Sequence, residues 1–382
     1  MMKEFKGGRA LLLLALLLLA GASAFAAEPV RPGSLPSAVR AEGANHHVQG
    51  IAIDREAGRM YFSFTTSFVK TDLQGRVLGS IDKIQGHLGA ITFNPQDRKV
   101  YASLECKDDV IGRGLSDFAA GQSMFYIAII DVDALDRVGV PSEGTDIFKV
   151  VCIREAGADY NAKVTVEGRT LDHALGCSGI DGVTIAPKMG ARAGSRNYLY
   201  VAYGIYGDTA REDNNYQVLL RYDFRALNAR ALPVSFGTFY AGGPAHPLDK
   251  YFIYTGNTTW GVQNMAYDPS TEHLFLSVYR GSKDRLPNYD QFIVPMWEKP
   301  VRRMLEGVPY VKKPQKVVGS AAVPVPGWYF SRGSTGLCPA GDGWWYISEN
   351  GRDKQTGRQV CEAHLYRWTG FNGTKVPFVR EP

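Results

Sequence analysis

The chain has 382 residues, of which 45% are hydrophobic, 12% aromatic and 21% charged, and its net charge is +5. This apolar content is enough for a packed core, so general disorder, a collagen-like chain and a coiled coil are excluded. Its 20 tyrosines and 42 glycines favour β-structure with many turns. The small net charge, without a basic run or a known binding motif, indicates no nucleic-acid partner.

Residues 1–26 have the pattern of a secretory signal peptide. Basic residues precede an apolar run from Leu11 to Ala20, and small residues at Ala24 and Ala26 form a cleavage site. The run is shorter than the roughly 20 residues that span a bilayer, and no second long apolar run follows it. We therefore expect cleavage after Ala26, a secreted or periplasmic location, and no transmembrane segment in the mature chain.

We expect residues 27–45 to form an N-terminal extension and residues 46–382 to form one domain. Five segments of this domain share a pattern, in which a short β-rich run, a turn and a second run follow one another. The first runs begin at Val48, Leu88, Ile180, Val262 and Ser334. The second runs end at Ser63, Ser103, Ala202, Ser277 and Ser348.

Further apolar runs follow these pairs and predict a third and a fourth strand in each unit. Clear third runs are Phe125–Asp131, Tyr216–Asp223 and Ala363–Trp368. Units of four antiparallel strands that pack around an axis form a β-propeller, because a single unit cannot bury both of its faces. The sequence thus predicts an all-β fold with five blades and long insertions in blades two to four.

Six blades are the alternative, since the long gap between Leu88 and Ile180 has room for another blade. We also expect a hairpin near Ala162–Thr170 and a short helix within Pro295–Glu306.

The repeats resemble those of bacterial secreted propellers in the YVTN/NHL-like group. Val48-Gln-Gly-Ile-Ala-Ile-Asp54 and Lys99-Val-Tyr-Ala-Ser103 show the two halves of that pattern. The resemblance implies the propeller architecture over most of the mature chain. It implies no single activity, because this fold hosts hydrolases, lyases, binding proteins and scaffolds.

Five cysteines follow the predicted cleavage site, and an oxidising compartment favours disulfides between some of them. The candidate pairs are Cys152 with Cys177 and, alternatively, Cys106 with Cys177. An odd count leaves at least one thiol unpaired, and we expect Cys338, on an inner strand, to be buried.

In a propeller the first strand of each blade lines the central channel, and the starts of these strands meet on one face. His47 and His87 occupy the same repeat position in adjacent blades, and Asp181 stands at the start of the third blade. Neutral imidazole is a common ligand of transition metals and a usable general base. His47, His87 and Asp181 therefore form a candidate site for a divalent metal ion, although the sequence is equally compatible with no cofactor.

The loops after the second strands bring carboxylates to the same face. Asp181, Glu105 and Asp208 are the candidate catalytic groups, because neighbouring carboxyls in a partly desolvated cleft acquire separated pKa values. The candidate substrate-binding residues are His46, Gln49, His87, Trp260, Gln263, Arg332, Tyr206 and Glu349.

Aromatic faces beside carboxylates suit a sugar ring, so the first hypothesis is a glycoside hydrolase-like enzyme acting on carbohydrate, which needs two carboxyls roughly 5–10 Å apart. A non-catalytic ligand-binding or protein-interaction propeller is the first alternative. A metal-dependent lyase or lactonase is the second. In each case we expect a monomer that binds a small molecule or a glycan.

The chain contains no nucleophile elbow, phosphate-binding loop or HExxH motif.

Overall fold

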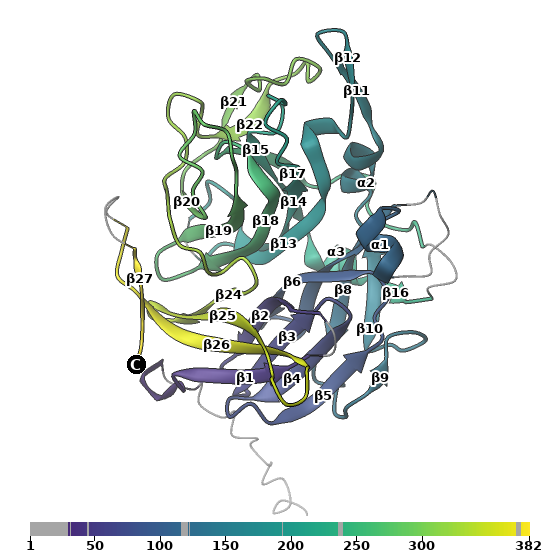
Figure 1. The fold of residues 1–382 in the computed structure, drawn as a ribbon, viewed down its shortest axis with the longest axis vertical. Helices are drawn as coiled ribbons and strands as arrows, with labels where there is room; N and C mark the ends of the chain where they lie inside the picture. The colour runs from purple at the N-terminus through teal and green to yellow at the C-terminus, as the bar shows by residue number, and fades with distance from the viewer. Residues whose placement is uncertain are drawn as a thin grey trace, which may run out of the picture.

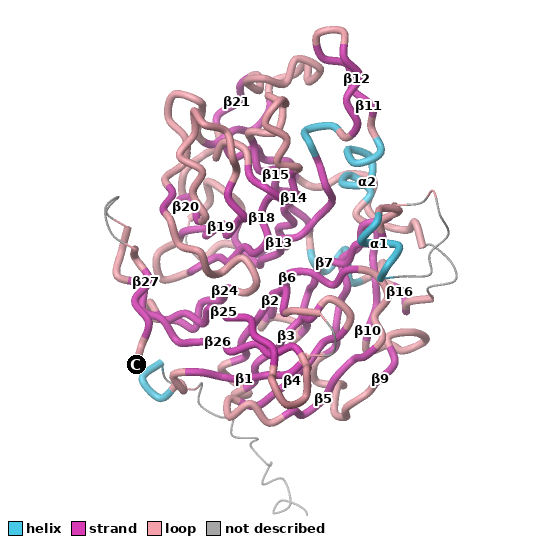
Figure 2. The backbone as a smooth tube through the Cα atoms, viewed as in Figure 1, coloured by secondary structure: helices cyan, strands magenta, loops and turns pink. Residues whose placement is uncertain are grey.

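The computed structural model describes residues 30, 32–43, 46–115, 121, 123–192, 194–235, 240–371 and 376–382. The predicted signal peptide therefore lies outside the described residues. Five small sheets form a ring (Figure 1), and Figure 2 shows that helical segments are few and short. This arrangement is a five-bladed β-propeller, as the repeat predicted.

The first two blades each contain four main strands and a short added one. Blade one consists of β2 (Val48–Asp54), β3 (Arg59–Phe64), β4 (Ser67–Asp72), β5 (Val77–Asp82) and β9 (Val140–Pro141). Blade two consists of β6 (His87–Asn94), β7 (Lys99–Cys106), β8 (Met124–Asp131), β10 (Phe148–Cys152) and β16 (Leu232–Pro233).

Blades three and four carry the longest inner strands. Blade three consists of β13 (Cys177–Pro187), β14 (Asn197–Ile205), β15 (Tyr216–Tyr222), β17 (Asp249–Tyr254), β22 (Gln315–Val318) and β21 (Val301–Arg303). Blade four consists of β18 (Thr258–Asp268), β19 (His273–Arg280), β20 (Gln291–Pro295) and β23 (Gly327–Trp328).

Blade five combines the two ends of the described chain. It consists of β24 (Leu337–Gly341), β25 (Trp344–Arg352), β26 (Gln359–Trp368), β1 (Ala38–Glu42) and β27 (Phe378–Arg380). Strand β1, from the segment predicted as an extension, runs antiparallel to β26 with Ala38 opposite His364. The N-terminal strand thus completes the last blade and closes the ring.

The insertions carry the remaining elements. They are η1 (Pro32–Ser34), α1 (Val110–Leu115), α2 (Arg154–Asn161), the hairpin of β11 (Lys163–Val166) and β12 (Arg169–Asp172), η2 (Ala174–Gly176) and α3 (Phe224–Asn228). The predicted hairpin is confirmed. The predicted helix within Pro295–Glu306 is wrong: Val301–Arg303 is strand β21, because the edge of β22 provides antiparallel partners for its backbone. No helix in the described part of the chain is long and apolar enough to cross a bilayer.

The core is divided into five layers, one between each pair of neighbouring blades. Consecutive residues of each second strand face opposite layers, because side chains alternate along a strand. In blade one, Tyr61 packs toward blade two, while Phe62 packs toward blade five. In blade four, Leu274 and Phe275 divide in the same way between blades three and five.

The predicted disulfides are absent, since all five cysteines are buried free thiols. Cys106 and Cys152 face the layer between blades one and two, whereas Cys177 faces the layer between blades two and three. Blade two therefore separates Cys177 from both predicted partners.

The repeated serine at the end of the second strand links neighbouring blades. Ser63 Oγ donates to the backbone oxygen of Gly89 at 2.7 Å, and Ser103 Oγ donates to that of Asp181 at 2.8 Å. Each bond crosses from a second strand to the inner strand of the following blade. The serines therefore fix the inner strands around the axis, and one of them holds the backbone of Asp181.

Truncation of the chain before Gly43, which removes β1, should open blade five. Five residues of backbone pairing and the buried Val39 and Ala41 would be lost, which predicts a fall of about 4 kcal/mol in the free energy of unfolding. Urea denaturation measures this fall. A chain that begins at Val30 is the control and should match the full chain, and equal stability of the two truncations would contradict the role of β1.

Candidate functional site

A pocket of about 230 Å³ lies where the inner strands of blades one to four begin. Helix α1, in the insertion between β7 and β8, contributes apolar side chains to its wall. The pocket is lined by His47, Gln49, His87, Glu105, Lys107, Ile111, Gly112, Leu115, Ser178, Asp181, Trp260, Gln263 and Tyr279.

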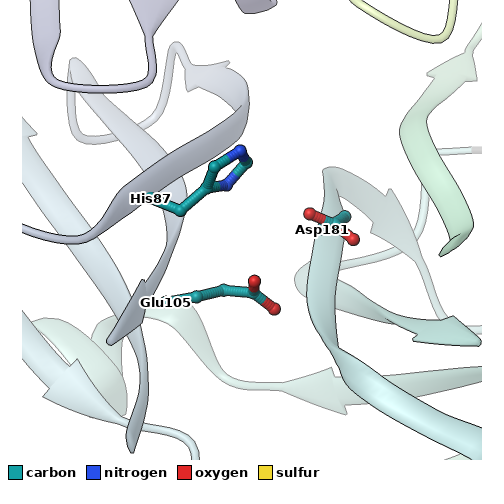
Figure 3. A group of neighbouring side chains, drawn as sticks. All are labelled: His87, Glu105 and Asp181. Carbon is teal, nitrogen blue, oxygen red and sulfur yellow. The ribbon is translucent and has the colours of Figure 1, made fainter. Parts of the chain in front are cut away.

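Three side chains converge at this pocket from two neighbouring blades. His87 begins β6 and lies opposite Glu105 near the end of β7, so antiparallel pairing places both at the same end of blade two. Asp181 comes from β13 of blade three, where pairing with β14 is shifted by a bulge between Ile180 and Val183. One donor atom of each of the three residues lies within 4.8 Å of the other two, and Figure 3 shows them around a common space.

The carboxylate of Glu105 is buried, with 4% of its side chain exposed. The backbone N–H of Ile180 donates to its Oε1 at 2.6 Å, and the Lys107 ammonium lies 3.0 Å from its Oε2. A Cβ on Gly179 would lie 1.9 Å from Oε1, and Gly179 has a φ of +135°, so this position requires glycine. Burial raises the pKa of Glu105, and Lys107 and the Ile180 N–H partly oppose that effect.

Lys107 is the buried cation of the site. Its ammonium also donates to the backbone oxygen of Ser178 at 3.1 Å and lies 3.6 Å from the carboxylate of Asp109. Burial lowers the pKa of Lys107, but Glu105, Asp181 and Asp109 outweigh burial and raise it. Lys107 therefore stays protonated at physiological pH and holds Glu105 in place.

Of the two carboxylates that line the pocket, Asp181 has fewer partners than Glu105. Among the described residues only Gln263 donates a hydrogen bond to its carboxylate, from Nε2 to Oδ2 at 3.1 Å. Burial, and then the charge of Glu105, raise the pKa of Asp181 well above its usual value, while Lys107 and Gln263 act in the opposite direction. Its free carboxylate form is thus unfavourable without a further proton or cation.

The two histidines of the pocket are neutral at physiological pH. Burial, with a smaller effect of Lys107, lowers the pKa of His87 to about 3. Its Nδ1 is buried and has no hydrogen-bond partner within the described residues. Burial and His46 lower the pKa of His47, whose Nε2 lies 3.1 Å from the amide nitrogen of Gln49. Neutral imidazoles can bind a metal or accept a proton.

Seven of the residues predicted from the sequence lie together at this pocket. They are His47, Gln49, His87, Glu105, Asp181, Trp260 and Gln263. His46 is exposed and adjacent in sequence to His47 but does not line the pocket. Tyr206 lies behind Trp260, with ring centroids 5.6 Å apart, and also does not line it.

The other predicted residues have local partners elsewhere. Asp208 accepts a hydrogen bond from the backbone N–H of Ala210 at 2.8 Å in its own loop. Arg332 and Glu349 form an ion pair at 2.7 Å, and Arg332 lines a separate pocket between blades four and five. The structure therefore does not gather all the predicted carboxylates into one cleft.

Lys107 is the residue that the sequence reasoning missed. It lies two positions after Glu105 and directly follows β7, and side chains two apart on an extended chain point to the same side. This spacing was the available signal for a cation beside Glu105.

No known protein family matches the chain, and no curated protein matches it. Among solved structures, hydrazine synthase from Kuenenia stuttgartiensis is similar over 78% of this chain and 80% of that chain, with 14% identity and a TM-score of 0.33. A likeness at this level carries no information about function.

Replacement of Asp181 by Asn should stabilise the metal-free protein at pH 7. Since the pKa of Asp181 is raised on folding, the folded state binds the proton more tightly than the unfolded chain, and stability falls as pH rises through the raised pKa. Asp181→Asn removes that loss, so we expect a melting temperature higher by a few degrees at pH 7. The gain should shrink as the pH falls and vanish below about pH 3, roughly one unit under the ordinary Asp pKa, where both states are protonated.

Calorimetry in the presence of a chelator measures this difference. The exposed Asp146 provides the control, because its carboxylate pairs with Lys149 on the surface, and Asp146→Asn should have little effect at either pH. An Asp181→Asn variant less stable than the wild type at pH 7 would contradict the prediction.

Proposed function

We propose that this protein is a metal-dependent enzyme of the lyase or lactonase type, with a divalent ion held by His87, Glu105 and Asp181. The observation that carries the proposal is the convergence of the three donor atoms within 4.8 Å of one another at one pocket. The pocket of about 230 Å³ suits a small substrate better than a polymer chain.

The size of the cluster is compatible with a metal ion. The centre of a triangle with sides of 4.8 Å lies about 2.8 Å from each corner, and metal–ligand bonds are about 2.0–2.6 Å long. An inward movement of less than about 1 Å by each side chain therefore completes three bonds. One imidazole and two carboxylates suit a transition ion such as Mn²⁺ or Zn²⁺.

The charge balance of the site also favours a cation. Lys107 pairs with Glu105 and acts on Asp181 only through its charge, and Gln263 is the one described residue that donates a hydrogen bond to the Asp181 carboxylate. His87 supplies a neutral imidazole, and its Nδ1 lacks a partner within the described chain. A divalent ion would satisfy these groups together.

A bound ion would act as a Lewis acid on a carbonyl or carboxylate oxygen of the substrate. In a lactone this would make the carbonyl carbon open to attack by water, and in an elimination it would make the proton next to the carbonyl more acidic. His47, which is neutral and lines the same pocket, would take the proton in either case. Lys107 adds fixed positive charge on the side of Glu105.

The carbohydrate hydrolase, the first hypothesis from the sequence, becomes the second candidate, because Glu105 and Asp181 bring two carboxyls together beside the exposed Trp260. In that reaction Asp181, with its raised pKa, would act as the acid. The contacts of Glu105 argue against it as a nucleophile, whereas each of its oxygens keeps a second lone pair that can bind a metal ion. Both of its oxygens are engaged, by Ile180 N–H and by Lys107, so it is poorly placed to attack a sugar.

Calorimetric titration of the purified protein with MnCl₂ and with ZnCl₂ tests the metal site. We expect one bound ion per chain and affinity reduced at least about tenfold in His87→Ala, Glu105→Gln and Asp181→Asn, because each variant removes one ligand. Asp208→Asn is the matched control, since Asp208 lies in its own loop outside the pocket. A protein that binds neither ion would contradict the metal hypothesis.

A turnover screen separates the remaining outcomes. Hydrolysis of lactones or elimination from uronates that is lost with a chelator and restored by the metal supports the proposal. Glycoside hydrolysis that a chelator does not affect supports the second candidate. Metal binding without any turnover would indicate a ligand-binding propeller instead.

A further inference from the structure

Trp260 has an unusual backbone conformation at the wall of the pocket. Its φ is +63°, and that of the following Gly261 is +71°. The two residues lie in β18 where the pairing with β19 is shifted between Thr259 and Val262. A bulky side chain is rare at such a φ, so the surrounding structure must hold this conformation in place.

The contacts around the bulge show how it is held. A Cβ on Gly261 would lie 2.4 Å from the backbone nitrogen of Ile205 and 2.6 Å from the Cα of Gly204, so only glycine lets the bulge lie against β14. A Cβ on Gly204 would in turn lie 2.8 Å from Asp181 Oδ2 and 2.9 Å from the Trp260 oxygen. The bulge and the candidate metal ligand Asp181 therefore both pack closely against Gly204.

Gln263 connects the bulge to that ligand. Its Nε2 donates both to the backbone oxygen of Trp260 at 2.9 Å and to Asp181 Oδ2 at 3.1 Å. The position of the Trp260 backbone and that of the carboxylate are thus set by one amide group.

The indole itself is fixed on one side and open on another. Its ring packs against Tyr206 with an interplanar angle of 63°, yet 41% of the residue stays exposed. Tyr279, from the paired strand β19, is 37% exposed and lines the same pocket. An exposed tryptophan held in an unfavourable backbone conformation beside polar groups is the arrangement expected of a ligand-binding wall.

We propose that Trp260 determines substrate specificity by stacking on the apolar face of a single hydroxylated six-membered ring, such as a sugar acid or a sugar lactone. The hydroxyls of the ring would face the amides of Gln49 and Gln263, which line the same pocket. The inference rests on the proposed function only for the metal that would hold the carbonyl or carboxylate of the ring. The stacking wall itself needs no metal.

Two probes with the same carboxylate separate ring recognition from charge recognition. Methyl β-D-glucuronide is locked as a ring, whereas gluconate is an open chain. We expect calorimetric titration to show that the wild-type protein prefers the glucuronide. Trp260→Ala should weaken glucuronide binding about 3- to 10-fold, the size of one aromatic contact, and leave gluconate binding unchanged. Trp260→Phe should retain most of the preference.

Trp297→Ala is the matched control, because Trp297 is also exposed but packs against His273, away from the pocket. If Trp260→Ala does not fold by circular dichroism, Trp260→Leu keeps the bulk without the flat ring and should also lose the preference. Equal preference in Trp260→Ala or Trp260→Leu and wild type, or no preference in the wild type, would overturn the inference.

The titrations are run on chelator-treated and on Mn²⁺-loaded protein. A protein that fails to bind Mn²⁺ but still prefers the ring, with that preference lost in Trp260→Ala, refutes the metal site and supports the role of Trp260. A protein that binds Mn²⁺ but shows no ring preference refutes the role of Trp260 alone.

Discussion

The close approach of neighbouring inner strands at the axis is the contact on which the rest of the structure depends. A Cβ on Gly50 would lie 2.7 Å from the backbone nitrogen of Ile91, and one on Gly182 would lie 2.8 Å from the Val262 side chain. Glycine lets these strands meet, and serine hydrogen bonds such as that of Ser103 to the backbone of Asp181 hold them together. As a result, the starts of four inner strands share one small volume, and their polar side chains form one pocket.

That convergence places like charges close together in a poorly solvated space. Lys107 compensates Glu105, but Asp181 is held near Glu105 with one amide donor, and the raised pKa of Asp181 reflects this. Buried charges without full compensation reduce stability, and such arrangements are common at functional sites. The pocket therefore combines a rigid backbone with carboxylates whose negative charge the described residues only partly compensate.

The repeat predicted the fold because it reflects two structural requirements. Side chains along each strand must alternate between two core layers, and a glycine or serine must stand near the axis. The repeat also predicted that His87 and Asp181 would share a face, since it placed both near the starts of inner strands. It could not place Asp208 or Glu349, because local partners set these side chains, the Ala210 N–H in the loop of Asp208 and Arg332 beside Glu349 on β25.

The predicted disulfide pairs were wrong for a related reason. Whether Cys152 and Cys177 can meet depends on which side of a blade each faces, and proximity along the chain does not reveal this. The segment near Val301, where a helix was expected, is a strand because β22 has a free edge with which its backbone pairs. The repeat pattern does not include β22 and so gave no sign of this pairing.

The pairing of β1 with β26 has a consequence for the order of assembly. Ala38 pairs with His364, a residue near the opposite end of the chain. Formation of this contact therefore has a high entropic cost of loop closure. Every residue of the pocket, from His47 to Tyr279, belongs to blades one to four or their insertions. During synthesis the binding surface can thus form from local blade–blade contacts while the ring is still an open arc, and the closing strand then converts a flexible arc into a rigid toroid.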